Sequence, residues 1–573
     1  MKIIKLFGLL VLLSFVACKE TTLSEQIHVL IANYEKPREY DFKRNESLES
    51  TIKFYTVEAE FAEKLKAELE KVSTEGVSET DKISRELLLF VLQDKIDQHT
   101  FKTYLNEITS ESAFHLNLSR MASRSFKNEK QVKEYFKQLE GLPKRIDYNI
   151  DILRAGVKEG ISQPKAVFNE YEKTYDKHII EDVTKSEFYT PFLKLPESLS
   201  AEKKDSIISA AKMSVQQNAI DQYKKIKNFF ENEYFPNTRK ELGVSTIPNG
   251  KEFYQNRINF YTTSTKYTAE DIHQIGLKEV VRIKAEMQQI IDGLGFKGSF
   301  ADFINFLRTD KQFYAKTPNE LMMFARDISK RIDAELPRFF KTLPRKPYGV
   351  VPVPAAIAPN YTSGRYSGST SETTAGFYWV NTYNLPSRTL YTIPALTAHE
   401  AVPGHHLQIS LNNELSDTIP AFRRGLYLSA YGEGWGLYSE TLAEEMGIYT
   451  TPYEKFGKLT YEMWRACRLV VDTGVHAKDW TRQQVLDYMA SNTALSLHEV
   501  RTETDRYISW PGQALSYKMG EIKIREMRKK AETELGEKFN IRDFHEVILA
   551  EGTVTLSILE SRINSYIVNT KNE

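Results

Sequence analysis

Helical periodicity dominates the pattern of apolar and polar positions along this 573-residue chain. Between residues 24 and 240, apolar residues recur three and four positions apart, as in YTVEAEFAEKLKAELEKV over residues 55–72. This spacing gathers the apolar side chains on one face and predicts amphipathic helices. A further stretch over residues 267–291 begins at Thr268 with an acidic residue three positions later, which predicts a helix that starts with a capping box.

The pattern changes between residues 347 and 384. The segment PYGVVPVPAAIAP is β-branched and broken by proline, and AGFYWVNTYN is aromatic and extended in character. The polar segment NYTSGRYSGSTSETT between them is typical of a turn region. We therefore expect a small sheet or hairpin inserted in a mainly α-helical protein, with prolines that suit an edge strand. From about residue 390 the helical pattern resumes.

A Gly/Pro-containing break at residues 241–254 divides the helical pattern. We expect an N-terminal helical half over residues 19–240 and a second half over residues 241–573, which holds the candidate catalytic residues. A chain of this length can bury a large core without help from disulfides. Its cysteines are only Cys18 and Cys467.

The first 18 residues differ from the rest. Lys2 and Lys5 precede an apolar run from Leu6 to Val16, which is too short for a permanent membrane span and has the form of a secretory signal. The small residue before Cys18 resembles the lipobox of bacterial lipoproteins, which predicts an exported protein held to a membrane by a lipid on Cys18. A plain signal peptide cut nearby is the alternative. The membrane face, periplasmic or outer, stays open.

Composition excludes one class of partner. Lys plus Arg and Asp plus Glu each number 77, so the net charge is zero, and 41% of the residues are hydrophobic. No basic run is interleaved with aromatic residues, so we expect no nucleic-acid partner. The 31 tyrosines and 31 phenylalanines suit either a large core or a cleft for an extended organic ligand.

The segment TAHEAVPGHHLQ at residues 397–408 contains the strongest candidate chemistry. It approaches the zinc-binding pattern His-Glu-x-x-His, but the residue four positions after His399 is Pro403. An undisturbed helix would not bring His405 or His406 beside His399. Pro403 lacks an N–H group and Gly404 has wide backbone freedom, so a bulge or loosened turn here would return His405 to His399.

The remaining donors are carboxylates. Glu400 adjoins His399 on the neighbouring face, where it can reach a water but not easily the ion, which is the place of a general base. Zinc in catalytic sites takes three protein ligands, so one more is needed. Glu433, between two glycines in YLSAYGEGWGLYSETLAEEMG, is the expected third ligand. Glu440 lies two turns later, as a supporting group or a rival ligand.

Four segments carry a family resemblance: HEAVPGHHLQ, YGEGWGLYSE, RACRLVVDTGVHAKDW and RYISWPGQALSYKMG. With them, most of residues 25–560 resembles bacterial, often lipoprotein, sequences labelled only as a domain of unknown function. These look like members of the gluzincin clan of zinc metallopeptidases. The resemblance implies a large helical metallopeptidase-like body with a deep cleft, and a zinc ion held by His399, Glu433 and His405. The departure from the usual spacing leaves His406 as the alternative second histidine.

The resemblance also implies a donor beyond the zinc helix that stabilises the oxyanion of the reaction. Tyr517 and His476 are the candidates, although a core tyrosine and a structural histidine are equally compatible with the sequence. AGFYWVNTYN is a candidate strand edge for an extended peptide, or a packed aromatic hairpin. Arg468, Arg501 and Arg506 are weaker candidates for binding a terminal carboxylate.

The sequence thus predicts a zinc-dependent hydrolase of peptide bonds, acting on short peptides in the manner of a carboxypeptidase or dipeptidase. Two alternatives remain. One is a surface-tethered lipoprotein that binds peptides or glycans without catalysis, and the other is an inactive relative that keeps zinc for structure. Metal content and the effect of Glu400→Gln distinguish the three.

Overall fold

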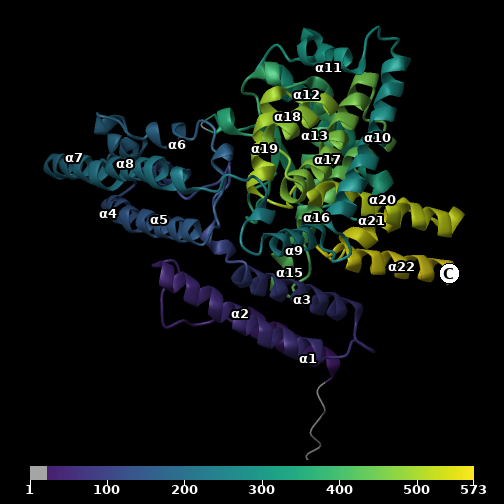
Figure 1. Cartoon of the computed structure of the whole chain (residues 1–573), viewed down its shortest axis with the longest axis horizontal. Coiled ribbons are helices and arrows are strands. Elements are labelled where there is room, and N and C mark those ends of the chain that lie inside the picture. Colours follow the sequence, from purple (N-terminus) through teal and green to yellow (C-terminus); the bar gives the residue numbers. More distant parts are fainter. Residues whose placement is uncertain (1–21, 356, 573) are drawn as a thin grey trace, which may run out of the picture.

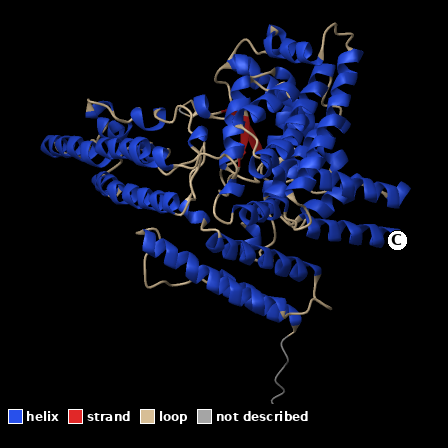
Figure 2. Cartoon of the chain, viewed as in Figure 1, coloured by secondary structure: helices blue, strands red, loops and turns tan. Residues whose placement is uncertain are grey.

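The computed structural model describes residues 22–355 and 357–572, so the predicted signal segment and Cys18 lie outside the described residues. Within them the chain is mainly helical with one small sheet, which confirms the expected fold class (Figures 1 and 2). The capping box predicted for the helix at Thr268 is present, since Thr268 and Asp271 cap one another's backbone. No helix among the described residues combines the length and apolarity needed to span a bilayer.

The N-terminal part forms two groups of helices. The first group, α1–α3, packs through its own apolar cluster, which includes Ile27, Leu65 and Leu88. The second group, α4–α8, lies to the left in Figure 1 and is rich in packed aromatic rings, such as Tyr135 and Phe192. The bounds are α1 Leu23–Glu35, α2 Leu48–Glu70, α3 Glu79–Thr100, α4 Glu129–Glu140, α5 Leu142–Lys158, α6 Lys173–Asp176, α7 Ala201–Val215 and α8 Asp221–Asn228.

The second part forms the larger helical body. Its helices are α9 Gly250–Thr262, α10 Ala269–Gly293, α11 Phe300–Thr309, α12 Pro318–Phe339, α13 Ile393–Glu400, α14 His405–Asn413, α15 Ala421–Arg424, α16 Ser429–Glu445, α17 Pro452–Lys478, α18 Arg482–Asn492, α19 Leu497–Ser509, α20 Leu515–Leu535, α21 Ile541–Leu549 and α22 Leu556–Asn572. One cluster of buried apolar side chains runs from α4 and α5 into this body, so the two parts share a core.

Helix α17 is the centre of the body. Nearly all of its side chains from Phe456 to His476 are buried, including charged ones. Glycines let neighbouring helices pack closely against α17. An added Cβ at Gly276 of α10, for example, would lie 2.7 Å from Leu469. The charges on its buried face are paired, and Lys518 of α20 lies 2.9 Å from Glu462. Such satisfied buried pairs fix the position of neighbouring helices.

The sheet has the strand order β1-β3-β2, with β1 Tyr348–Pro352, β2 Gly364–Ser367 and β3 Gly376–Val380. Strand β3 pairs in parallel with β1, where Val350 is opposite Tyr378, and antiparallel with β2, where Tyr366 is opposite Tyr378. The aromatic segment expected to offer a strand edge is therefore the central strand, with both edges paired. The free edges belong to β1 and β2, and β2 arises in the segment predicted as a turn region.

Candidate metal centre

The helix that carries His399 ends at Glu400, and a new helix begins at His405. The sequence predicted a bulge or a loosened turn here, and the structure has a turn over residues 401–404 that separates the two helices. The N–H of Gly404 donates to the carbonyl of Ala398 at 3.0 Å and the N–H of His406 to Ala401 at 3.0 Å, so the turn keeps its backbone bonded. In His-Glu-x-x-His, one helical turn brings the two histidines together. Here the break takes the place of that turn and still brings His405 next to His399.

Gly404 is required at this turn because the backbone folds tightly over itself. A Cβ atom there would lie 1.9 Å from the carbonyl oxygen of His399 and 2.5 Å from that of Ala398. The indole N–H of Trp435 on α16 donates to the carbonyl of Pro403 at 2.8 Å and holds the turn against that helix. The turn and the helix that carries Glu433 are thus fixed relative to each other.

Three donor atoms converge at the break. His399, His405 and Glu433 each offer one ligand atom, and these atoms all lie within 4.8 Å of one another. The Nε2 atoms of His399 and His405 lie 3.5 Å and 3.4 Å from Oε2 of Glu433. The two imidazole rings are nearly perpendicular, with centroids 4.8 Å apart. Both histidines are buried and Glu433 is half-buried.

These distances fit a zinc ion. With bonds of about 2.0–2.1 Å, a tetrahedral zinc holds neighbouring ligand atoms about 3.4 Å apart. Separations of 3.4 and 3.5 Å are long for direct N–H···O hydrogen bonds, which cluster near 2.9 Å. Two imidazoles and one carboxylate are a donor set that zinc accepts, with a position left for water. One feature departs from the usual pattern, because Nδ1 of His405 is buried without a hydrogen-bond partner among the described residues.

The glycines around Glu433 each make room for a different neighbour. An added Cβ at Gly436 would lie 2.7 Å from the ring of His399, and one at Gly434 would lie 2.6 Å from Gly520 of α20. A Cβ at Gly432 would collide with the ring of Tyr427 at 2.5 Å. Gly434 therefore lets α20 approach α16 closely, while Gly436 leaves room for the ring of His399.

Glu440 supports His399 from behind. Its Oε1 lies 2.8 Å from Nδ1 of His399, and Arg465 of α17 lies 3.5 Å from the same oxygen. Burial disfavours the imidazolium, but the nearby carboxylates of Glu433 and Glu440 outweigh it and raise the pKa of His399 to about 10 in the metal-free protein. Nδ1 faces Glu440, so Nε2 is the nitrogen directed at Glu433. Glu440 is thus placed as a supporting carboxylate rather than as a rival ligand.

His406 points away from this centre. Its Nδ1 lies 3.0 Å from the hydroxyl of Tyr366 and 3.2 Å from that of Ser410, and its ring packs against Tyr348. Burial lowers the pKa of His406 to about 4, so it is neutral. The structure brings His405, and not His406, to His399 and Glu433.

Glu400 is held by the sheet. The backbone N–H of Tyr366 in β2 donates to Oε2 of Glu400 at 2.7 Å, while the other oxygen accepts no hydrogen bond from the residues that the structure describes. The carboxylate is buried beside His399. A β-strand thus orients one oxygen and leaves the second available.

The comparisons with known proteins agree with this architecture. The model of the family described as "Bacterial protein of unknown function (DUF885)" matches residues 50–563. The chain belongs to this family. None of the curated proteins matches the DUF885 chain.

Two solved structures share the fold of this DUF885 protein. "The crystal structure of the putative lipoprotein from Colwellia psychrerythraea" superposes with a TM-score of 0.79 at 26% identity, and the match covers 96% of this chain and 100% of that one. A structure described as "a putative lipoprotein of unknown function from Shewanella oneidensis" has a TM-score of 0.62 at 18% identity, over 94% of this chain and 96% of that one.

Two tyrosines of the DUF885 protein, Tyr427 and Tyr517, are relevant to the centre, and of these Tyr427 is exposed and Tyr517 is buried. The hydroxyl of Tyr427 donates to Oε1 of Glu433 at 3.1 Å. Loss of solvation and the charge of Glu433 raise the pKa of Tyr427 well above its usual value, so it remains a donor. The ring centroid of Tyr517 lies 5.9 Å from the guanidinium of Arg465, the residue that contacts Glu440. The sequence did not identify Tyr427. The one local signal was Gly432, whose lack of a side chain leaves room for a bulky neighbour.

Arginines line the same region. The guanidinium of Arg468 lies 4.2 Å from the ring centroid of Tyr517, and Arg506 lies 3.4 Å from its hydroxyl. Glu503 pairs with Arg468 at 2.9 Å and with Arg506 at 3.5 Å. Even so, Nη1 of Arg468 and Nε of Arg506 are buried without partners among the described residues. The arginine pair therefore keeps unused donors.

Two residues that the sequence did not single out complete this region. Arg365 of β2 is solvent-exposed, and Glu111 reaches toward it from the N-terminal part. Surrounding protein raises the pKa of Glu111, while Arg506, Arg365 and Arg468 oppose the shift.

Two predicted residues lie elsewhere. His476 is 11 residues beyond Arg465 on α17, about 16 Å along the helix. Its Nδ1 accepts from the N–H of Val244 at 3.2 Å and its Nε2 lies 2.9 Å from the carbonyl of Tyr507. Both ring nitrogens are thus engaged in fixing the backbone, which makes His476 a core residue rather than an oxyanion donor. Arg501 is exposed on α19 and is separate from the Arg468–Arg506 pair.

Proposed function

We propose that this DUF885 protein is a zinc-dependent hydrolase of peptide bonds in short peptides. The observation that carries the proposal is the pair of 3.4–3.5 Å separations between Oε2 of Glu433 and the histidine Nε2 atoms. They match the edges of a zinc tetrahedron better than they match hydrogen bonds. When bound, zinc supplies a Lewis acid that acidifies water and polarises a carbonyl oxygen.

The side chains of the chain itself divide the remaining work. Glu400, with one oxygen fixed by Tyr366 and the other free, accepts a proton from the attacking water and returns it to the leaving amine. The Tyr517 hydroxyl donates to the oxyanion that develops on the carbonyl oxygen. Glu440 holds His399 in the tautomer whose Nε2 lone pair faces Glu433.

Substrate binding is assigned to the arginines and to the sheet. A terminal carboxylate meets Arg506, which is only half-buried, because a guanidinium group offers paired N–H bonds. An extended peptide adds to the free edge of β2, beside the strand segment that fixes Glu400. Both features favour short peptides with free carboxyl ends.

The test combines metal analysis with a matched pair of variants. Purified protein should contain about one zinc per chain and should hydrolyse members of a short-peptide library followed by mass spectrometry. Glu400→Gln should keep the zinc and lose hydrolysis, whereas Glu372→Gln, at an exposed glutamate of the loop before β3, should change neither. Protein without affinity for zinc would refute the metal site. Protein that binds zinc but cleaves no peptide would favour the structural or binding alternatives.

We also propose that the chain is an exported lipoprotein, tethered through Cys18. The signal-like segment before Cys18 and the description of the Colwellia relative as a lipoprotein support this. Cys18→Ala should release the protein from the membrane fraction of cells that express the full chain. Equal membrane association of both forms would contradict lipidation at Cys18.

A further inference from the structure

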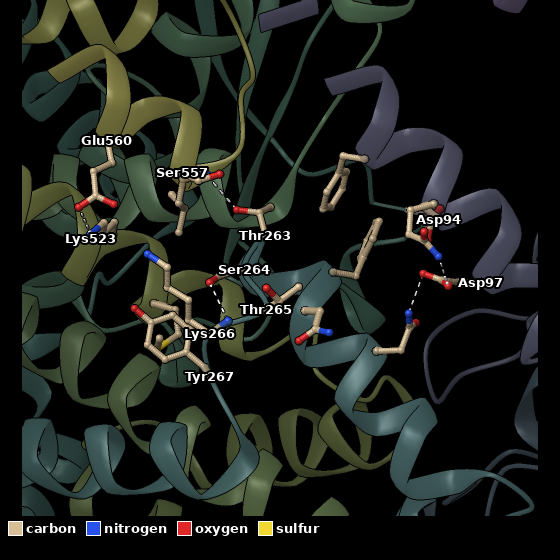
Figure 3. Close-up of a pocket in the computed structure, with 17 residues that line it drawn as sticks. Asp94, Asp97, Thr263, Ser264, Thr265, Lys266, Tyr267, Lys523, Ser557 and Glu560 are labelled. Carbon is tan, nitrogen blue, oxygen red and sulfur yellow. Dashed lines mark hydrogen bonds and ion pairs between the residues drawn. The ribbon is translucent and has the colours of Figure 1, made fainter. Parts of the chain in front are cut away.

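A cavity of about 550 Å³ lies away from the metal centre, where α3 of the N-terminal part meets α9, α20 and α22. Its volume is within the range of small-molecule sites. None of its lining residues belongs to the metal centre or to the arginine region. Figure 3 shows Asp94 and Asp97 at one side of it, and Lys266, Lys523 and Glu560 at the other.

The acidic side holds two carboxylates one helical turn apart on α3. Asp97 accepts amide N–H groups from Gln93 at 2.9 Å and from Asn256 at 2.7 Å, and Asp94 accepts from Gln98 at 2.6 Å. These amides orient the carboxylates but carry no charge. Among the described residues, the one cation within 4 Å of either is Arg257, which lies 3.7 Å from Asp94.

The proximity of these two poorly solvated carboxylates is electrostatically unfavourable. Loss of solvation raises the pKa of Asp94, and the neighbouring charge of Asp97 adds to the shift, while Arg257 opposes it. Like charges one turn apart on a helix repel each other, and poor solvation strengthens the repulsion. An ammonium group between the carboxylates would relieve both costs, because each oxygen retains an unused lone pair.

The opposite side offers a free cation. Lys523 is paired with Glu560 at 2.7 Å, but the ammonium of Lys266 has no ion pair within 4 Å among the described residues. Lys266 follows Thr263, a β-branched residue held at φ +50°, whose hydroxyl accepts the N–H of Leu556 at 2.9 Å. This left-handed conformation is unfavourable for threonine, so α22 fixes the turn that presents Lys266.

Apolar rings occupy the wall between the two charged sides. Phe90 of α3 and Phe260 of α9 stack with centroids 5.6 Å apart and an interplanar angle of 22°. Tyr267 and Met519 also line the cavity. The cavity thus presents an acidic side, an apolar wall and a basic side, which complements a molecule with an ammonium group, an apolar body and a carboxylate.

We propose that this cavity binds a short peptide with free ends, a zwitterion whose ammonium and carboxylate are held apart. The ammonium group lies between Asp94 and Asp97, the apolar body packs on Phe90 and Phe260, and the carboxylate pairs with Lys266. The site is separate from the proposed catalytic centre, and its existence does not depend on zinc or on hydrolysis.

The test uses calorimetric titration of full-length His399→Ala protein, which lacks the metal centre and cannot turn over the probe. The probes are the dipeptide Ala-Phe, its N-acetyl form, its C-terminal amide, and phenylalanine. Ala-Phe should bind at one site, and phenylalanine should bind at least about tenfold more weakly, because its two charges share one carbon and cannot reach both sides of the cavity. Loss of either charge should weaken binding by at least about tenfold, because charge-assisted hydrogen bonds are lost.

Variants locate the binding. Asp94→Asn with Asp97→Asn, and separately Lys266→Gln on its exposed turn, should each weaken binding by about tenfold or more. Asp205→Asn, at an exposed position of α7, is the matched control and should have no effect. The proposal is overturned if Ala-Phe does not bind to His399→Ala protein. It is equally overturned if binding survives in both cavity variants, since Lys266→Gln leaves the core untouched.

Discussion

Replacement of Gly404 by alanine tests whether the turn at residues 401–404 builds the metal centre. The new Cβ would lie 1.9 Å from the carbonyl oxygen of His399, whereas ordinary contacts begin at 3.4 Å. The obstacle is backbone, so the chain must separate by about 1.5 Å to restore normal contact. His405 is the next residue, and it shares in that displacement.

A metal site tolerates only much smaller displacements of its ligands than this one. Ligand distances in real sites stay within about 0.2 Å of ideal values, and disturbance of supporting groups alone weakens metal affinity by about 10–100-fold. We therefore expect Gly404→Ala to weaken zinc binding by at least about 100-fold. Overpacking should also cost about 1–3 kcal/mol of stability.

The assay is competition for zinc against a chromophoric chelator, with far-UV circular dichroism to verify folding. Gly425→Ala is the matched control, because the nearest atom to its new Cβ lies 3.9 Å away. It should bind zinc as the wild type does. If folded Gly404→Ala also binds zinc with wild-type affinity, the turn does not determine the position of His405.

Three further predictions concern the surroundings of the centre and the core. Glu440→Gln should weaken zinc affinity by about 10–100-fold in the same competition assay, because His399 loses a charged partner at Nδ1. Arg506→Gln should raise KM by about tenfold for peptides with a free carboxyl end and leave KM for their amides unchanged; equal effects on both would exclude a carboxylate contact. Burial raises the pKa of Asp472 from its usual value to about 7, although the hydroxyl of Tyr254 and the N–H of Gly512 oppose the shift. The folded state therefore holds this proton more tightly than the unfolded state. The free energy of unfolding should therefore fall by up to about 4 kcal/mol as pH rises from about 4 through 7, and Asp472→Asn should flatten this dependence in urea titrations at pH 5 and pH 8.

The sequence by itself determined the helical character of the chain. Apolar residues three and four positions apart define helix faces whatever those faces pack against, and Thr268 with Asp271 marked a helix start from purely local chemistry. It also indicated where the backbone must be unusual. Pro403 lacks the N–H of a normal helix bond and Gly404 adds backbone freedom, at the position where the structure has its break.

Only the tertiary structure decided which donors meet. Both His405 and His406 follow the break, and the choice between them depends on the direction in which α14 starts, which Trp435 fixes from a different helix. His476 carried the same local signal as a functional histidine, but Val244 and Tyr507 occupy its two nitrogens. Pairing between strands that are distant in sequence also decides that β2, and not the aromatic strand β3, lies at an edge of the sheet. Local patterns specify helices because their hydrogen bonds are local, whereas a metal centre and a sheet edge are properties of several segments that only long-range packing brings together.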